Sequence, residues 1–281
     1  MFGENEGKLC WRKSDLVSVV IPSLGAPHLT KTIDSLLCSD LIKVVIIVLP
    51  RGNKFYYDDE RIKIVYSNIR GQVAQRAFGI KMVSTEFLIL MDDDISVSSS
   101  VISNMYKFCL YNQNAAVAPV LCDNETKLPF VTNISRAKRL LYYYLFGLKK
   151  TGSFNSATIT LSFVGNSEMG PQKVDWLPGG ISMSRTKKAI NYNYFSKIEG
   201  KAFAEDILMS YLRTKENNVE HFILPDQFAF TDLPKQRYSL NFAIQNFITR
   251  YRVARIMRSG RLYTLLVLLI ESVLMFLLQK K

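Results

Sequence analysis

The sequence predicts an α/β protein, in which a mostly parallel β-sheet is flanked by helices and followed by a helical C-terminal extension. Three observations predict this fold class. Short, almost wholly apolar segments recur along the first half of the chain, amphipathic helical segments alternate with them, and most of the apolar segments stop at a proline or an acidic residue. Strands that are apolar throughout are typical of parallel sheets, because helices cover both faces of such a sheet.

Four strands are expected in the first third of the chain. They are Leu16 to Ile21, Lys43 to Leu49, Ile62 to Tyr66 and Phe87 to Met91. Pro22 and Pro50 end the first two, since proline cannot donate to a central ladder. Apolar residues at helical spacing predict a helix over Thr30 to Leu37, with Thr30 as its cap, and another over Gln72 to Val83.

The second half of the chain continues this alternation less regularly. A helix is expected near Val101 to Tyr111 and a strand over Ala115 to Leu121, and later a helix within AFAEDILMSYLRTK and a strand within HFILPDQFAFTD. Residues 123–175 mix basic, aromatic and Ser/Thr/Gly-rich stretches. A loop-rich substrate region is therefore expected there.

The C-terminal segment is first basic and then apolar. Residues 239–261 predict a basic amphipathic helix, and Leu262 to Leu278 is almost wholly apolar but contains Glu271. As a helix this apolar run would be about 25 Å long, against a hydrocarbon core of roughly 30 Å. Because basic residues flank it on both sides, we expect a helix lying in or against the cytoplasmic face of an anionic membrane. The alternative is a buried helix of the domain or of a dimer.

Composition and charge limit the possible partners. The chain has 281 residues, of which 48% are hydrophobic and 21% charged, the balance of a folded protein, and its net charge is +12. This charge suggests nucleic acid, an anionic membrane or a phosphorylated substrate as partner. Nucleic acid is disfavoured, because the positive charge concentrates near the apolar C-terminus and no zinc-finger or RNP-like motif is present. The four cysteines show no C-x-x-C spacing and the N-terminus lacks the apolar run of a signal peptide, so a cytoplasmic protein is expected.

The acidic triplet Asp92-Asp93-Asp94 follows the apolar run Phe87 to Met91 directly. Ligands of α/β sheets bind beyond the carboxyl ends of the strands, and three adjacent carboxylates repel one another unless a cation or solvent relieves them. In an extended segment Asp92 and Asp94 would point the same way and address one ligand together. Mg²⁺ or Mn²⁺ suits such oxygens and would bridge to a diphosphate. The alternative is a solvated turn in which Asp94 caps the next helix.

Four segments together resemble the family 2 glycosyltransferases. They are SVVIPS, SNIRGQVAQRAFGIKMVSTEFLILMDDD, WLPGGISMSR and FAEDILMSYL, and the resemblance spans roughly residues 16–235. It implies a GT-A fold, which is a Rossmann-like, mostly parallel sheet flanked by helices. It also implies metal-dependent transfer of a sugar from a nucleotide-diphosphate donor, with inversion. The membrane-seeking C-terminus suggests a glycan or lipid-linked acceptor, and so a role in cell-surface polysaccharide or glycoconjugate biosynthesis. The implied division is a transferase domain over 1–235, with a nucleotide-binding half (14–122) and an acceptor-binding half (123–235), and C-terminal helices over 236–281.

The resemblance assigns roles to individual residues. On the donor side it implies Pro22, Ser23, Asn68, Arg76, Asp92 and Asp93, with Asp92 and Asp94 holding the metal-bound diphosphate. Where donor sugar and acceptor meet it implies Gly179 and Gly180, and Trp176 is suited to stack on a sugar or to pack in the core. The pair Glu205-Asp206 matches the family's acidic pair, in which Asp206 is the catalytic base and Glu205 orients it or contacts the acceptor.

Three departures from the family pattern bear on these roles. The segment Leu49-Pro50-Arg51 lacks the acidic residue that often recognises uracil, so UDP is the default nucleotide without that support. Ala77 replaces an asparagine after Arg76. Asp232 stands where many members carry a histidine metal ligand, while His221 is expected to have an ordinary surface role. A sugar-phosphate nucleotidyltransferase is the alternative enzyme, but the segment SLGAPHLTKT lacks its Gly-rich, Arg-containing phosphate loop.

Overall fold

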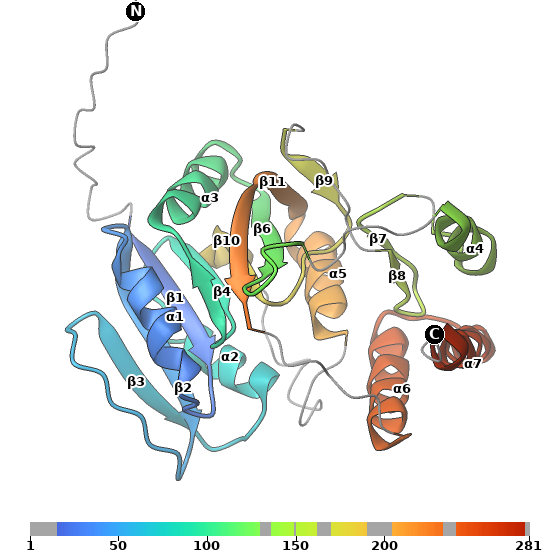
Figure 1. Cartoon of the computed structure of the whole chain (residues 1–281), viewed down its shortest axis with the longest axis horizontal. Coiled ribbons are helices and arrows are strands. Elements are labelled where there is room, and N and C mark those ends of the chain that lie inside the picture. The colour runs from blue at the N-terminus through green and yellow to red at the C-terminus, as the bar shows by residue number, and fades with distance from the viewer. Residues whose placement is uncertain are drawn as a thin grey trace, which may run out of the picture.

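The structure is a computed structural model, which describes residues 16–129, 136–148, 150–161, 170–189, 204–232 and 240–278 (Figure 1). A central sheet runs through the described part of the chain, with helices on both of its faces. The helices α4 (Arg136–Phe146), α6 (Leu240–Ile256) and α7 (Arg261–Leu278) gather at one side of it.

The strand order of the main sheet is β3-β2-β1-β4-β10-β6-β11-β5, and β9 pairs with β11. Its strands are β1 (Val17–Pro22), β2 (Ile42–Pro50), β3 (Ile62–Ser67), β4 (Phe87–Met91), β5 (Ile95–Val97), β6 (Ala115–Asp123), β9 (Gln172–Val174), β10 (Ile181–Arg185) and β11 (Glu220–Thr231). A separate hairpin pairs β7 (Ser153–Phe154) with β8 (Thr160–Leu161). The strands expected over the first third of the chain, near Ala115 and within HFILPDQFAFTD are thus confirmed.

The sheet is mixed rather than wholly parallel. The β1–β2, β2–β3, β1–β4 and β6–β11 pairs are parallel, whereas β10 runs antiparallel between β4 and β6. This antiparallel strand carries the sequence ISMSR, directly after Gly179-Gly180. Its position brings the two glycines to the carboxyl end of β4, beside the acidic triplet.

The helices of the main domain are α1 (His28–Leu37), α2 (Gln72–Ile80), α3 (Ser99–Tyr111) and α5 (Glu205–Asn217). Each corresponds to a predicted helix, with shifted ends. Thr30 is not the cap of α1, because the helix begins at His28 behind Pro27. Proline is favoured at such a start, since its missing N–H would have no partner there.

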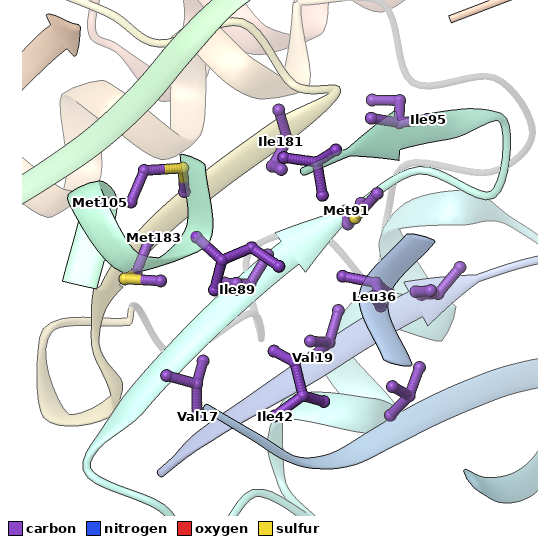
Figure 2. Close-up of a cluster of buried hydrophobic side chains, with 14 of the residues drawn as sticks. Val17, Val19, Leu36, Ile42, Ile89, Met91, Ile95, Met105, Ile181 and Met183 are labelled. Atoms are coloured by element: carbon purple, nitrogen blue, oxygen red, sulfur yellow. The ribbon is translucent and has the colours of Figure 1, made fainter. Parts of the chain in front are cut away.

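The two faces of the sheet bury separate cores. Val17, Val19 and Ile21 pack with α1 and α3 on one face (Figure 2). Val20 packs with α2 and α5 on the other. Alternate side chains of a strand point to opposite faces, so an apolar strand such as β1 serves both cores.

Gly79 allows α2 to lie directly on the sheet. A Cβ atom at this position would lie 2.5 Å from Cγ1 of Val20 and 2.8 Å from Cγ2 of Val48. We expect Gly79→Ala to lower the free energy of unfolding by about 1–2 kcal/mol, because overpacking outweighs the gain from replacing a helical glycine. Urea denaturation would measure this. Gly170→Ala, which adds its methyl group to open space, is the matched control, and equal stability of both variants would contradict the packing argument.

The C-terminal helices pack into the protein more extensively than the sequence indicated. The helix expected over 239–261 ends at Ile256, and after a turn in which Arg258 has a φ of +63° a second helix begins at Arg261. Glu271 is not an isolated charge, since Arg250 of α6 forms an ion pair with it and also donates to the carbonyl oxygen of Thr158 at 2.8 Å. No helix in the described part of the chain is long and apolar enough to cross a membrane.

Two further expectations need correction. Residues 123–175 are less loop-rich than predicted, since α4, β7, β8 and β9 lie among their described positions. His221 does not have a surface role, because its side chain is buried in β11. Burial, together with the nearby Arg213 guanidinium, lowers the pKa of His221 to about 3, so the ring stays neutral.

Candidate active site

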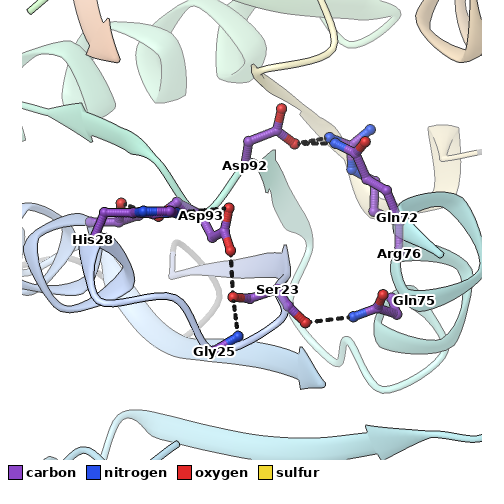
Figure 3. A network of polar contacts seen from close by, with 9 residues as sticks. Ser23, Gly25, His28, Gln72, Gln75, Arg76, Asp92 and Asp93 are labelled. Carbon is purple, nitrogen blue, oxygen red and sulfur yellow. Dashed lines mark hydrogen bonds and ion pairs between the residues drawn. The ribbon is translucent and has the colours of Figure 1, made fainter. Parts of the chain in front are cut away.

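The acidic triplet sits at the carboxyl end of β4, as its sequence position predicted. The backbone N–H of Asp92 donates to the carbonyl oxygen of Gly180 at 2.8 Å, which adds one more hydrogen bond to the β4–β10 ladder. The chain then turns at Asp93 and Asp94 before β5 begins. The triplet is therefore a turn rather than an extended segment, and Figure 3 shows the side chains of Asp92 and Asp93 pointing in different directions.

Asp92 points toward α2. Its Oδ1 atom accepts a hydrogen bond from Nε2 of Gln72 at 2.7 Å and pairs with Nη2 of Arg76 (Figure 3). Burial raises the pKa of Asp92 to about 6, the neighbouring Asp94 adds to this rise, and Arg76 opposes it. Asp94 thus lies close enough to raise the pKa of Asp92. This proximity does not require both side chains to face one ligand.

Asp93 points toward the end of β1. Its Oδ2 atom accepts a hydrogen bond from the Ser23 hydroxyl, and Nε2 of His28 lies 3.5 Å from its Oδ1 atom. Ser23 Oγ in turn accepts from the backbone N–H of Gly25 at 2.9 Å. The predicted donor residues Ser23 and Asp93 are therefore brought together, joined by His28, which the sequence did not single out.

Asp94 lines a small depression together with Asp232, His28 and Thr32. Burial raises the pKa of Asp94, and the adjacent Asp93 raises it further. Hydrogen bonds from Asn124 and Lys31 lower the pKa of Asp232, so this carboxylate is ionised. The structure therefore places Asp232 beside Asp94, although more than a hundred residues separate them in the chain.

These residues can hold a divalent cation only if a bound molecule supplies some of the cation's ligands. Carboxylate oxygens are the donors that Mg²⁺ and Mn²⁺ prefer. In the described part of the chain, however, no three His, Cys, Asp or Glu side chains are grouped so that they could hold a metal ion by themselves. The two carboxylates of the depression therefore fit an ion whose remaining ligands come from an anionic substrate or from water.

One face of α2 forms the polar floor of the site. Gln72 and Arg76, four residues apart, both reach Asp92, while Nε2 of Gln75 donates to the carbonyl oxygen of Ser23 at 2.8 Å. Side chains at these spacings lie on the same side of a helix. The family resemblance assigns a role only to Arg76 on this face, although the same helical spacing identifies both glutamines.

Arg76 connects the triplet to α5. Its guanidinium is 1% exposed, pairs with Asp92 and with Glu205, and donates to the carbonyl oxygen of Gly179 at 2.9 Å. An arginine presents several donors in a fixed plane, so it can hold partners from three segments at once. The family resemblance places Arg76 on the donor side, and here its guanidinium is engaged by Asp92, Glu205 and Gly179.

Glu205 and Asp206 open α5 beneath Gly179. Burial raises the pKa of Glu205 to about 7, and the carboxylates of Asp92 and Asp206 act in the same direction against Arg76. Burial also raises the pKa of Asp206, whose Oδ1 atom accepts from the backbone N–H of Ile207 at 2.9 Å. The preceding residue, Ala204, has a φ of +62°, a left-handed conformation that costs an alanine about 1 kcal/mol.

Gly179 and Gly180 carry no side chain, which leaves open the space between the acidic triplet and the pair Glu205-Asp206. A Cβ atom at Gly179 would lie 3.4 Å from Cβ of Asp206, and one at Gly180 would lie 2.8 Å from Cδ1 of Ile95. Gly179 thus permits close approach to the acidic pair, and Gly180 permits close packing of the β10 strand. The structure thus brings Gly179 next to the acidic pair, and a backbone hydrogen bond from Asp92 brings Gly180 next to the triplet.

The other predicted residues lie around this centre with different surroundings. Pro22 is buried as the last residue of β1, and Asn68 is exposed just beyond β3. Trp176 packs partly against the core formed with α5, and its buried indole N–H has no hydrogen-bond partner in the described part of the chain. Both of the roles expected for Trp176 are compatible with this position.

The whole arrangement has two chemically different sides. On one side, the turn after β4 offers the carboxylates of Asp93 and Asp94 near the end of β1. On the other, Asp206 is a partly buried carboxylate with a raised pKa, which suits it to accept a proton. Arg76 lies between the two sides, where it pairs with Asp92 and with Glu205.

Comparisons with known proteins found a matching family model and similar solved structures. A family model described as "Glycosyl transferase family 2" matches residues 18–168. Among solved structures, a crystal structure of GalNAc-T7 with UDP, GalNAc and Mn²⁺ is similar with a TM-score of 0.58 and 11% sequence identity, over 86% of this chain and 48% of that chain. A crystal structure of S. aureus TarS 1-349 matches with a TM-score of 0.48 and 13% identity, over 90% of this chain and 69% of that one. No curated protein sequence matches significantly. The chain spans about half the length of the GalNAc-T7 chain that it matches.

Proposed function

The chain belongs to glycosyl transferase family 2, and we propose that it transfers a sugar with inversion from a nucleotide-diphosphate sugar to a hydroxyl group of a glycan or lipid-linked acceptor. One observation carries this proposal: Asp92 of the acidic triplet, Gly179 and Glu205 meet around the single side chain of Arg76, and Asp206 lies against Gly179. This arrangement supports Asp206 as a base for the acceptor, near the carboxylates that would handle the leaving group. The expected role in cell-surface polysaccharide or glycoconjugate synthesis belongs to the same proposal.

We assign the donor to the carboxyl ends of β1, β3 and β4. Pro22, Ser23 and Asn68 would line the nucleoside, and Asp93, held by the Ser23 hydroxyl, would face the ribose or the first phosphate. Because Oδ1 of Asp92 is already engaged by α2, the metal role falls mainly to Asp94 and Asp232. A bound Mg²⁺ or Mn²⁺ would neutralise the charge that develops on the departing diphosphate. UDP is the default nucleotide, and the GalNAc-T7 structure contains UDP.

We assign proton removal to Asp206. A sugar hydroxyl is a weak nucleophile, so a carboxylate must take its proton as the new bond forms at the anomeric carbon. The missing side chain at Gly179 leaves room for the acceptor beside Asp206. Glu205 would help to position Asp206 through its contact with Arg76. Trp176 would offer an aromatic face or its indole N–H to the acceptor.

A screen of nucleotide sugars tests this function most directly. Thermal unfolding would be followed with UDP-, GDP- and TDP-sugars, each with and without Mn²⁺. A ligand that binds only the folded protein raises the unfolding temperature. A metal-dependent rise with one class of nucleotide sugar is the expected result. A rise with sugar 1-phosphates and free nucleoside triphosphates instead would favour the nucleotidyltransferase alternative.

The metal role of Asp94 gives a separate prediction. Asp94→Ala is expected to weaken binding of a nucleoside diphosphate by about tenfold or more in Mn²⁺ buffer, since a charge-assisted contact is lost. Binding without metal should change little. Isothermal titration calorimetry would measure both affinities. Asp40→Ala is the control, because Asp40 is exposed just before β2, at the amino ends of the parallel strands and so away from the site. An unchanged affinity of Asp94→Ala in Mn²⁺ would remove Asp94 from the metal site.

We further propose that the enzyme works at the cytoplasmic face of a membrane, attached through its C-terminal helices. The basic net charge and the apolar character of α7 support this location. A basic nucleic-acid-binding protein would carry the same charge. Flotation with anionic vesicles, in parallel with a DNA-binding measurement, separates the two: binding to DNA but not to vesicles would refute the membrane location.

A further inference from the structure

The helix α7 is apolar on two opposite faces. One face is buried: Val267 and Leu268 pack in a core with residues of α4, and Thr264 on the same face is also buried. The other face carries Leu262, Leu266, Leu269 and Val273, each more than half exposed. Their spacings of four, three and four residues form one continuous stripe along a helix. A stripe of this kind on a folded chain marks a surface that contacts an apolar partner.

A second helix adds to this exposed apolar surface. Tyr142 and Phe146 of α4 are buried in the same core as Val267 and Leu268, while the other side chains described from Leu140 to Leu145 are exposed. Its exposed large side chains are Leu140, Leu141, Tyr143, Tyr144 and Leu145. The sequence pattern over Arg136–Phe146 predicts loop rather than this helix. Figure 1 shows α4 and α7 at the same side of the molecule, away from the central sheet.

The charges of these helices identify the partner. The sequences of α4, α6 and α7 contain seven basic residues and a single acidic one, Glu271, which Arg250 neutralises. Arg252 of α6 is exposed, and so are Arg258 and Arg261, which directly precede the stripe in the chain. A second copy of the chain, which also carries a net charge of +12, would place basic residues against basic residues. An anionic bilayer offers the opposite charge together with an apolar interior.

We infer that α4 and the outer face of α7 together form a docking surface for an anionic lipid bilayer, lying in its interface rather than crossing it. Tyr143, Tyr144 and Tyr263 are exposed on these helices, and tyrosine is favoured where apolar and aqueous regions of a bilayer meet. This surface specifies the membrane location proposed above. Its purpose would be to bring a lipid-linked acceptor to the enzyme, and that purpose rests on the proposed function.

Flotation of the full chain with vesicles tests the surface. Wild type is expected to bind phosphatidylcholine vesicles that contain phosphatidylglycerol, and to bind pure phosphatidylcholine more weakly. Leu266→Glu and Tyr144→Glu are each expected to lower the partition coefficient by about tenfold or more, because apolar contact is replaced by like-charge repulsion. Raising the salt from about 0.1 M to about 1 M should weaken wild-type binding, since screening shortens the range of the attraction.

Matched controls separate this surface from general effects. The controls are Leu128→Glu and Tyr111→Glu. Leu128 is 58% exposed and Leu266 is 56% exposed, while Tyr111 is 82% exposed and Tyr144 is 77% exposed. Both control variants should bind vesicles as wild type does. Equal losses in the control variants, or none in Leu266→Glu and Tyr144→Glu, would overturn the surface. So would light scattering that shows a dimer dissociated by Leu266→Glu. Binding of Mn²⁺ and nucleoside diphosphate, measured without vesicles, reports separately on the proposed transferase.

Discussion

Asp206→Asn is expected to lower the turnover number of sugar transfer by about 10²–10⁴-fold, the usual contribution of a general base. An amide cannot take the proton of the acceptor hydroxyl, but its oxygen can still accept the hydrogen bond from the backbone N–H of Ile207. The start of α5 should therefore stay in place. Binding of the donor nucleotide in Mn²⁺ should change less than about threefold, because the donor contacts lie on the other side of Arg76.

Initial rates of transfer as a function of pH add a second measurement for Asp206. Burial raises the pKa of Asp206, and only the ionised carboxylate accepts a proton. The wild-type rate should therefore fall on acidification, beginning at a higher pH than an ordinary aspartate would give. Asp206→Asn should lose this acid limb. Glu216→Gln, exposed near the far end of the same helix, is the control. Activity of Asp206→Asn within about threefold of wild type would refute its assignment as the base.

Arg76→Met is expected to lower the free energy of unfolding by about 3–5 kcal/mol, the usual effect of removing one partner from a buried ion pair. The change leaves Asp92 and Glu205 without their shared counter-charge, and the carbonyl oxygen of Gly179 without its donor. Transfer activity should fall as well, because the triplet and α5 lose their common support. Urea denaturation and initial-rate measurements would record the two effects.

The stability deficit of Arg76→Met should depend on pH in a defined direction. Burial already raises the pKa of Glu205 to about 7 and that of Asp92 to about 6, and without the guanidinium both should rise further. A carboxyl group with a raised pKa in the folded state destabilises the fold as the pH increases from its unfolded value through its folded one. The deficit should therefore be smaller near pH 5 than near pH 8.

Arg76→Lys keeps the charge but not the planar set of donors, so it should fall between wild type and Arg76→Met. This variant keeps the measurement possible if Arg76→Met does not fold. Arg252→Met, at an exposed position of α6, is the control. A deficit below about 1 kcal/mol for Arg76→Met at pH 8 would mean that the buried cluster is not held by this residue.

The sequence was sufficient for those elements whose burial is periodic along the chain. The run FLILM in β4 and the apolar face of α2 are of this kind, since each residue's neighbours in sequence report its surroundings. It did not predict the antiparallel direction of β10, nor the short strand β5, which has three residues. Such features depend on partners distant in the chain, which local patterns do not specify. The buried state of His221 escaped prediction for the same reason.

The candidate site was predictable in its members but not in their contacts. Asp92, Gly179 and Glu205 were identified from separate segments, and the structure joins them through Arg76, 129 residues before Glu205. The expectation that Asp92 and Asp94 share a direction assumed an extended segment, whereas the chain turns there. Glu271 shows the same limit: alone in an apolar run it suggested a costly charge, because its partner Arg250 lies on another helix.

The helix α6 contributes to two cores at once. Val253 is buried with the residues of α5 that follow the proposed base, while Phe247 and Tyr251 pack against the core shared by α4 and α7. The docking helices and the start of α5 should therefore move as one rigid body. On a bilayer, such a body would hold the reaction centre at a fixed height above the lipid headgroups. The enzyme would then select acceptors whose reactive hydroxyl projects to that distance from the membrane.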